Sequence, residues 1–271
     1  MTAFLERVRA RRPPGAEAVT DFPSLYRWSV TRPDAFWPEV WDFCGVVAEE
    51  RTGGNPWDED VVGLERMAPP DPALGPRWFT GARLNFAENL LRFADEREAL
   101  VFWSEQGRQR ALTYRELGDA VAAVASALRA HGIQPGDRVA GFLPNLPETV
   151  IAMLATASLG AIWSSCSPDF GANGVLDRFG QIAPRILFCA DGYRYAGKAI
   201  DSLARVREVC ERIPAIERVV VVGYLSEQPE LSGIRAAVAW NEWLESGRAV
   251  GRSGGQAVRE RRRRPPDRPT A

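Results

Sequence analysis

The sequence predicts an α/β fold in which a mostly parallel sheet is flanked by helices and follows an irregular, partly helical lead-in. From about residue 96 onward, short apolar runs alternate with longer amphipathic stretches, as in repeated strand–helix–strand units. The first 95 residues lack this alternation and include a proline-rich stretch at 66–77. With 45% hydrophobic residues, the chain can bury a sizeable core. We therefore expect a lead-in over 1–95, a partial α/β domain over 96–244 and a separate tail over 245–271.

Local signals predict the elements of the α/β part. Five apolar runs are typical of strands, and they are Ala99–Trp103, Arg138–Leu143, Ala161–Trp163, Ile186–Ala190 and Arg218–Gly223. A turn at Gln106–Arg108 predicts that Gln109–Thr113 is the return strand of a hairpin that begins with Ala99–Trp103. Four amphipathic stretches predict helices, and they run from a Thr113 cap to about Ala130, over Glu148–Leu159, over Gly174–Ala183 and from about Ala199 to Arg212. Glu116 follows Thr113 by three residues, which is the spacing of a capping box.

Two helices are expected in the lead-in. Asp34 is predicted to cap a helix that extends to about Glu50, where a Gly- and Pro-containing stretch ends it. Asn85 is predicted to cap a short helix at Phe86–Phe93.

The run Leu159–Gly171, LGAIWSSCSPDFG, is the most informative part of the chain. Its Ala161–Trp163 is interpreted as a short buried strand, and Ser164–Gly171 as a small-residue loop at the carboxyl end of that strand. Open α/β sheets bind ligands at such places, so the loop is a candidate ligand site. The alternative is that it only turns the chain. Trp163 itself is expected in the core rather than in a substrate pocket.

Composition excludes several classes of protein. The sequence shows neither an apolar run of 18 residues nor a secretory signal, so no membrane partner is expected. Four widely spaced cysteines without a CxxC pair indicate reduced thiols in a cytoplasmic protein. The single histidine, His131, falls in the predicted last turn of a helix, and no metal ligand is assigned.

The predicted tail is strongly basic. It holds eight Arg against three acidic residues, with five of the Arg within Arg259–Arg264. Such a composition cannot build a core, so disorder is expected. No aromatic residue is interleaved with the Arg run, and the body has no basic face to extend it, so no nucleic-acid partner is expected.

Five short motifs, in order, resemble the adenylate-forming, acyl-CoA synthetase-like family. They are Trp78–Asn85 with Asn89, Leu112–Leu117, Gly136–Val139, Leu143–Glu148 and Ala155–Ala161. Each is weak alone, whereas five at the right spacing are specific. Three further stretches resemble the acetoacetyl-CoA synthetase (acetoacetate–CoA ligase) branch, and they are Gly160–Gly171, Val175–Ile182 and Asp191–Lys198. The resemblance covers about residues 22–244.

This resemblance implies a partial N-terminal domain of an adenylate-forming enzyme. In such enzymes a carboxylate attacks the α-phosphate of ATP, and CoA thiolate then displaces AMP from the acyl-adenylate. The resemblance therefore implies ATP, CoA and Mg²⁺ as cofactors of the full-length enzyme, with acetoacetate, ATP and CoA as its small-molecule substrates.

The resemblance also places six residues where the acetyl-CoA synthetase branch contacts CoA, and they are Ser167, Pro168, Asp169, Arg194, Tyr195 and Lys198. A cation on a loop can hold the 3′-phosphate of CoA. Ser-Pro-Asp replaces an aromatic–Gly–Gly stretch of that branch, and Tyr195 replaces an Arg, for which the adjacent Arg194 can substitute. The alternative is a local structural role, with Lys198 at the start of a helix. No catalytic residue is assigned.

The family's triphosphate loop, rich in Ser, Thr and Gly and ending in Lys, is expected soon after residue 244 and is not found there. Gly251–Gly255 has neither threonine nor lysine and is interpreted as a linker. We therefore expect an N-terminal fragment without ligase activity of its own, such as a frame shift or a truncated gene model produces. Two other functions stay open: an acetyl- or propionyl-CoA synthetase-type ligase, and a CoA-binding module without catalysis.

Overall fold

The computed structural model describes residues 1–51, 54–65 and 75–247. The chain divides into two compact units, Met1–Asn85 and Phe86–Ala271. The predicted boundary after residue 95 therefore falls inside the second unit, which begins with the short helix α4 (Phe86–Leu90). This helix ends before Phe93, earlier than the sequence predicts.

The described residues of the first unit form three helices, so this part is more regular than the predicted lead-in. Its elements are α1 (Thr2–Arg11), α2 (Phe22–Thr31), α3 (Pro33–Cys44) and an antiparallel pair, β1 (Val61–Val62) and β2 (Arg77–Trp78). A small core of Phe4, Val8, Leu25 and Trp28 joins the helices.

The predicted helix from Asp34 to Glu50 needs correction at both ends. Arg32 is the N-cap of α3, and Asp34 lies in the first turn, where its carboxylate pairs with the Arg32 guanidinium at 2.8 Å. The helix ends at Cys44 because Gly45 adopts a left-handed conformation, with φ of 59°.

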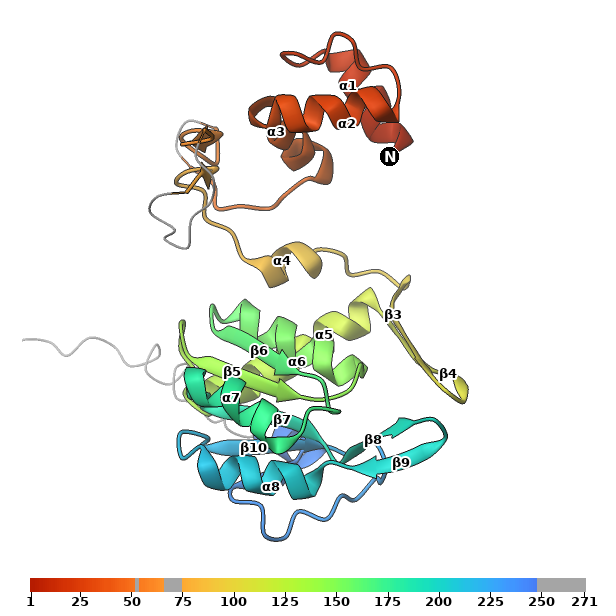
Figure 1. The fold of residues 1–271 in the computed structure, drawn as a ribbon, viewed down its shortest axis with the longest axis vertical. Helices are drawn as coiled ribbons and strands as arrows, with labels where there is room; N and C mark the ends of the chain where they lie inside the picture. The colour runs from red at the N-terminus through yellow and green to blue at the C-terminus, as the bar shows by residue number, and fades with distance from the viewer. Residues whose placement is uncertain (52–53, 66–74, 248–271) are drawn as a thin grey trace, which may run out of the picture. The chain divides into compact units, whose positions relative to one another are not determined.

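The second unit is an α/β domain, as predicted (Figure 1). It opens with the antiparallel hairpin β3 (Glu98–Ser104) and β4 (Gly107–Thr113), followed by α5 (Tyr114–Ala130). The predicted capping box is confirmed: the Thr113 amide donates to Glu116 Oε2 at 2.8 Å, and the Glu116 amide donates to Thr113 Oγ1 at 3.2 Å.

Five parallel strands form the central sheet in the order β11–β10–β7–β5–β6. They are β5 (Arg138–Phe142), β6 (Ile162–Cys166), β7 (Ile186–Ala190), β10 (Arg218–Val222) and β11 (Ala237–Ala239). The connecting helices are α6 (Pro147–Ser158), α7 (Ala172–Ile182) and α8 (Leu203–Arg212).

Both faces of this sheet are buried. In β7, Ile186 and Phe188 belong to one core, which also contains residues of α5 and α6. Leu187 and Cys189, between them in sequence, belong to a second core with residues of α7 and α8. This period-2 alternation assigns α5 and α6 to one face of the sheet and α7 and α8 to the other.

The sheet is built outward from β5 in both directions, and the chain turns back after the edge strand β6. From β5 it passes through α6, on one face, to β6 at the sheet edge, and then through α7, on the other face, to β7 on the opposite side of β5. This order is that of a doubly wound sheet with its topological switch point between β5 and β7, where such sheets bind ligands beyond the carboxyl ends of the strands.

The structure changes the interpretation of the run Leu159–Gly171. The strand extends to Cys166, so Ser164 and Ser165 belong to β6, and the loop begins at Ser167. The strand lies at the sheet edge, and Ile162 is 51% exposed rather than buried.

Trp163 packs into the core, as predicted, and its ring lies close to Phe188. Its ring also covers Gly141 of β5, and a Cβ atom on Gly141 would lie 2.5 Å from Trp163 Cζ2. The position therefore requires glycine because the ring occupies the space of a side chain.

A second hairpin, formed by β8 (Gly192–Tyr195) and β9 (Lys198–Asp201), directly follows β7 and was not predicted from the sequence. The helix predicted from Ala199 therefore begins only at Leu203, and Lys198 is a strand residue rather than the start of a helix. Strand β11 was also not predicted.

Residues 240–247 are helical, so the first three residues of the predicted disordered tail belong to a helix. The rest of that tail, from residue 248, lies outside the described residues, as does the candidate linker Gly251–Gly255.

All four cysteines are free thiols, as predicted, with Cys44 exposed and the other three buried. His131 follows α5 as its C-cap, and burial lowers its pKa. None of the described helices combines the length and the apolar character needed to cross a membrane.

A cluster of charged residues fixes the amino ends of three neighbouring strands. Arg185, before β7, donates to Asp137, before β5, at 2.7 Å and to Glu217, before β10, at 2.8 and 2.9 Å. The guanidinium also donates to the Gly132 carbonyl at 2.9 Å. The pKa of Glu217 is lowered chiefly by its hydrogen bonds from Arg185, and that of Asp137 by the Gln134 amide and then by Arg185.

We expect Arg185→Gln to lower the free energy of unfolding at pH 7 by about 2 kcal/mol, because it removes charge-assisted hydrogen bonds. Both carboxylates have a lowered pKa in the folded state, so their contribution is complete above the unfolded values of 3.8 and 4.5 and disappears as the pH falls through the folded values. Urea titrations followed by circular dichroism should therefore show a difference between parent and variant that shrinks from pH 5 to about pH 3.

The matched control is Arg212→Gln, which removes an exposed pair with Glu208 one helical turn away and a long, exposed hydrogen bond to Asn173 Oδ1 at 3.3 Å. Its effect should stay within about 0.5 kcal/mol. An Arg185→Gln difference that is constant or grows on acidification would contradict the assignment.

Candidate ligand-binding site at the switch point

A cavity of about 780 Å³ opens at the carboxyl ends of β5, β6 and β7, at the switch point of the sheet. Three segments line it: the turn after β5, the end of β6 with the loop that follows, and strand β8. The lining residues are Leu143, Pro144, Asn145, Thr149, Ser165, Cys166, Ser167, Pro168, Asp169, Tyr193, Arg194 and Tyr195. The topology thus gathers residues from distant parts of the sequence around one cavity.

Five of the six residues predicted to contact a ligand line this cavity: Ser167, Pro168, Asp169, Arg194 and Tyr195. Four of them are exposed, and Pro168 is buried and forms part of the cavity wall.

Lys198 is not among the lining residues. It pairs directly with Tyr195 across the β8–β9 hairpin. Directly opposed residues of an antiparallel pair project from the same face of the sheet, so Lys198 shares the hairpin face of Tyr195.

Arg205 of α8 connects two walls of the cavity, and the sequence analysis did not identify it. Its guanidinium donates to the carbonyl of Pro168 at 3.1 Å and to that of Asp201 at 3.0 Å, and it lies 5.8 Å from the centre of the Tyr193 ring. Arg205 thereby ties the loop after β6 to the end of the β8–β9 hairpin. Nothing in the sequence signals this role, because it depends on two segments that meet only in the folded chain.

The turn after β5 is held by a local bond. Thr149 Oγ1, in the first turn of α6, donates to the Pro144 carbonyl at 2.7 Å. This bond fixes the Pro144–Leu146 turn and keeps Asn145 on the cavity wall.

The cavity has the chemistry of a binding site and no evident nucleophile. Burial raises the pKa of the Cys166 thiol, so it remains protonated and unreactive near pH 7. Among the described residues, no three His, Cys, Asp or Glu side chains come together as metal ligands. The cavity offers instead a guanidinium, a carboxylate, hydroxyls, an amide and two aromatic rings.

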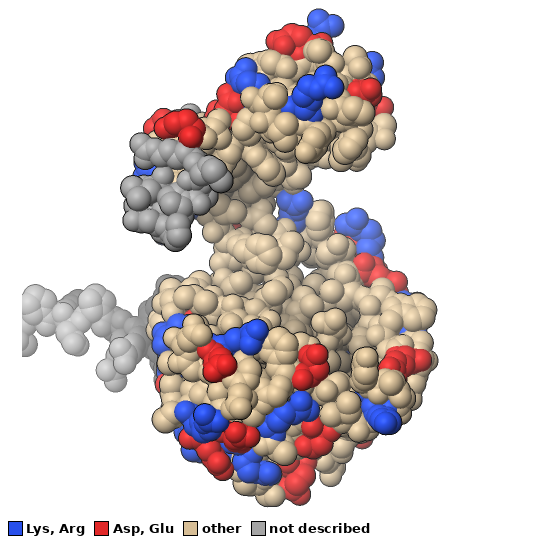
Figure 2. All heavy atoms as spheres, viewed as in Figure 1, with Lys and Arg blue, Asp and Glu red and all other residues tan. Residues whose placement is uncertain are grey.

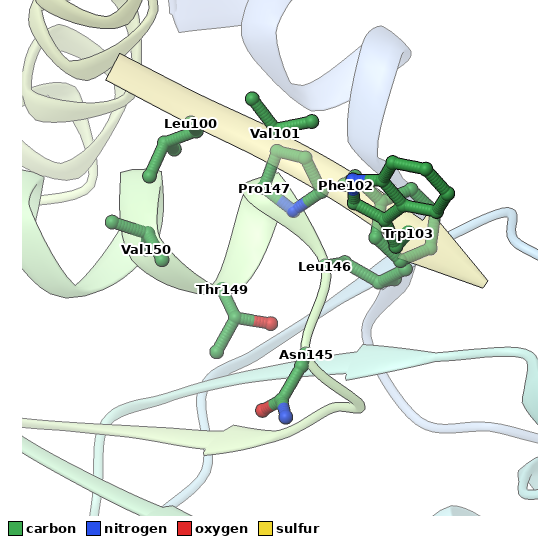
Figure 3. A pocket seen from close by; sticks show the side chains of 9 residues that line it. All are labelled: Leu100, Val101, Phe102, Trp103, Asn145, Leu146, Pro147, Thr149 and Val150. Atoms are coloured by element: carbon green, nitrogen blue, oxygen red, sulfur yellow. The ribbon is translucent and has the colours of Figure 1, made fainter. Parts of the chain in front are cut away.

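A second, mostly apolar cavity of about 390 Å³ adjoins the first, and Asn145 and Thr149 line both. Its other residues come from β3 and the start of α6, and they are Leu100, Val101, Phe102, Trp103, Leu146, Pro147 and Val150. Figure 3 shows Asn145 at one end of this cavity, away from the aromatic side chains of Phe102 and Trp103. Together the cavities suit an elongated ligand with a polar and an apolar part.

Charged residues of both signs are interspersed over the face of the second unit seen in Figure 2. Of the described residues that line the cavity, Arg194 is the one cation and Asp169 the one carboxylate.

Comparison with known proteins gives a consistent result. The family model described as AMP-binding enzyme matches residues 86–268. This match extends past Leu244, where the sequence analysis placed the end of the resemblance.

Curated relatives include an acetoacetyl-coenzyme A synthetase from Rhizobium meliloti (strain 1021), 46% identical over 212 residues, which are 78% of this chain and 30% of that protein. An acetoacetyl-CoA synthetase from Macaca fascicularis is 41% identical over 234 residues, 85% of this chain and 33% of that protein. A malonamoyl-CoA synthetase from Penicillium aethiopicum is 39% identical over 228 residues, 82% of this chain and 30% of that protein.

The solved structure of an acetoacetyl-CoA synthetase from Streptomyces lividans matches with a TM-score of 0.76 and 38% identity, over 89% of this chain and 35% of that one. This chain thus spans about a third of the length of these relatives. The similarities confirm the fold class and the resemblance to acetoacetyl-CoA synthetases that the motifs indicate. The chain belongs to the AMP-binding enzyme family.

Proposed function

We propose that this chain is the first part of an AMP-forming acid–thiol ligase that joins acetoacetate to CoA through an acyl-adenylate. Within it, we propose that the switch-point cavity binds the nucleotide end of CoA. The observation that carries the proposal is that Ser167, Asp169, Arg194 and Tyr195, from two separate segments, line one cavity in a chain 38–46% identical to proteins named acetoacetyl-CoA synthetases.

The chemistry of the cavity supports a phosphorylated nucleoside as ligand. The Arg194 guanidinium presents planar, paired donors to phosphate oxygens. Lys198 adds a second cation on the same hairpin, on the face that it shares with Tyr195. The Tyr195 ring gives a surface on which a base can stack, and the Ser167 hydroxyl and Asp169 carboxylate can hydrogen-bond to ribose or to an exocyclic amine. The adjoining apolar cavity can accept the less polar chain of CoA.

In the proposed reaction ATP supplies the adenylyl group that activates the carboxylate, and pyrophosphate leaves. No set of described residues suits Mg²⁺, so we assign no metal ligand to this chain and derive no step through the metal. The contribution of this part of the protein is to bind and orient CoA. The cytoplasm is the proposed compartment, because free thiols, three of them buried, persist in a reducing environment.

The acyl group is the least constrained part of the proposal. A malonamoyl-CoA synthetase matches at 39% identity, close to the 41% of an acetoacetyl-CoA synthetase. Acetoacetate is favoured because the named acetoacetyl-CoA synthetases include both the highest of these identities and the matched solved structure.

We predict that the 271-residue chain binds CoA and that Arg194→Ala weakens binding about tenfold, because a charge-assisted phosphate contact is lost. Isothermal titration calorimetry measures both affinities. If Arg194 faces the 3′-phosphate, the loss is smaller when 3′-dephospho-CoA is the ligand. Arg212→Ala, on the outside of α8, is the control and should bind as the parent does. Equal CoA affinity of parent and Arg194→Ala would refute the assignment.

We also predict that the 271-residue chain alone forms no thioester from acetoacetate, ATP and CoA, because it has no Ser/Thr/Gly-rich loop ending in Lys to hold the triphosphate. AMP release and thioester formation are measured with acetoacetate, and with acetate and propionate as competing acids. Turnover with acetoacetate would contradict this prediction, and turnover confined to acetate or propionate would contradict the choice of substrate as well. CoA binding by a monomer that never turns over, even with the rest of a homologous ligase added, would favour a stand-alone binding module.

A further inference from the structure

The β8–β9 hairpin, which carries Arg194 and Tyr195 to the cavity, has an unfavourable turn sequence. Its two-residue turn consists of Ala196 and Gly197, with φ of +50° and +74°. Two positive φ values correspond to a type I′ turn, which is most favourable with Asn-Gly. Gly197 adopts this conformation easily, but Ala196 has a Cβ atom that makes the left-handed region costly. Some other interaction must therefore stabilise the turn.

That interaction comes from Glu105, in the turn between β3 and β4. The Ala196 amide donates to Glu105 Oε1 at 2.7 Å, and the Gly197 amide donates to Oε2 at 2.8 Å. Consecutive amides in positive-φ conformation form a small concavity that binds anions, and the Glu105 carboxylate occupies it. One side chain thus satisfies both amides of the strained turn.

The other end of the hairpin is held in a similar way by Asp191, which is 4% exposed. Its carboxylate accepts from the amides of Tyr224, Leu225 and Ser226 at 2.8 to 3.1 Å, and its carbonyl accepts from the Ser202 amide at 3.0 Å. Gly192 follows without room for a side chain, since a Cβ there would lie 2.4 Å from the Ile200 carbonyl oxygen. The base of the hairpin is therefore fixed from within the domain core, and its tip depends on Glu105.

We propose that Glu105 is a positioning residue that holds the tip of the β8–β9 hairpin, and with it Arg194 and Tyr195, at the switch-point cavity. The nature of the ligand rests on the proposed function, whereas the fixation of the hairpin does not. The Glu105 carboxylate accepts hydrogen bonds from the turn amides of Ala196 and Gly197, and it acts on Arg194 and Tyr195 through the turn. Its effect on a ligand is thus indirect, through the placement of the two side chains.

The test compares Glu105→Ala with Asp119→Ala, which removes an exposed carboxylate from α5, remote in sequence from the hairpin. Amide hydrogen exchange is measured first, on the full chain without ligand. Glu105→Ala should accelerate exchange of the Ala196 and Gly197 amides about tenfold, while the amides of β7 keep their protection and show that the domain is folded. Asp119→Ala should change neither.

CoA affinity is measured next on the same proteins. Glu105→Ala should weaken CoA binding by about three- to tenfold, an indirect effect no larger than that of Arg194→Ala. The decisive variant adds Ala196→Asn, because an Asn-Gly turn favours type I′ geometry without help. In the Glu105→Ala background it should recover most of the lost affinity and protection, and in the parent it should change CoA affinity little.

The outcomes separate this inference from the proposed function. Unchanged exchange at Ala196 and Gly197 in Glu105→Ala would overturn the inference. The inference would also be overturned if Glu105→Ala accelerated exchange at the turn but left CoA affinity unaltered, while Arg194→Ala weakened CoA binding. A loss of protection and affinity in Glu105→Ala that Ala196→Asn fails to restore would overturn it as well. If CoA binds none of the proteins, the proposed ligand is wrong, and the ligand-free exchange with its rescue by Ala196→Asn still decides whether Glu105 fixes the hairpin.

Discussion

Burial of both faces of the five-stranded parallel sheet is the constraint on which the rest of the second unit depends. The central strands β5, β7 and β10 must present apolar residues alternately to two cores, as Ile186 to Ala190 do without interruption. Polar groups are therefore excluded from the interiors of these three strands and collect at the strand ends. Ion pairs around Arg185 occupy the amino ends, and the cavity occupies the carboxyl ends. Burial of the strands thus places the stabilising ion pairs at one end of the sheet and the candidate binding cavity at the other.

The cavity walls are held largely by side chains that bond to the main chain. Arg205 donates to carbonyls of the loop after β6, Thr149 to the turn after β5, and Asp191 and Glu105 accept from amides at the two ends of the β8–β9 hairpin. Bonds of this kind fix a loop's path and leave the side chains of the loop itself free. Ser167, Asp169, Arg194 and Tyr195 can therefore meet a ligand without also having to build the loops that carry them.

The sequence predicted elements whose signals are local and missed those that depend on distant partners. The capping box of Thr113 and Glu116 and the unbroken apolar run of β7 gave nearly correct boundaries, because each is encoded within a few adjacent residues. The hairpin at residues 192–201 was not predicted, because its turn at Ala196 and Gly197 lacks a favourable turn sequence. The side chain that stabilises this turn, Glu105, lies far away in the chain. Candidate site residues on β8 and after β6 came from family resemblance, and the doubly wound topology supplies an independent reason why they meet. Arg205 fell in no motif, and Asp191 began the matched stretch Asp191–Lys198 without an assigned role, because the roles of both arise only where separate segments fold together.

The packing of Trp163 over Gly141 has a consequence for how this part of the fold can evolve. The indole ring fills the space above the glycine, so any side chain at 141 would require a smaller residue at 163. These two positions, on the neighbouring strands β5 and β6, are constrained to change together. Because β5 and β6 also lead into the cavity walls, a substitution pair at these positions offers a route by which related proteins could reshape the crevice without altering any residue that faces the ligand.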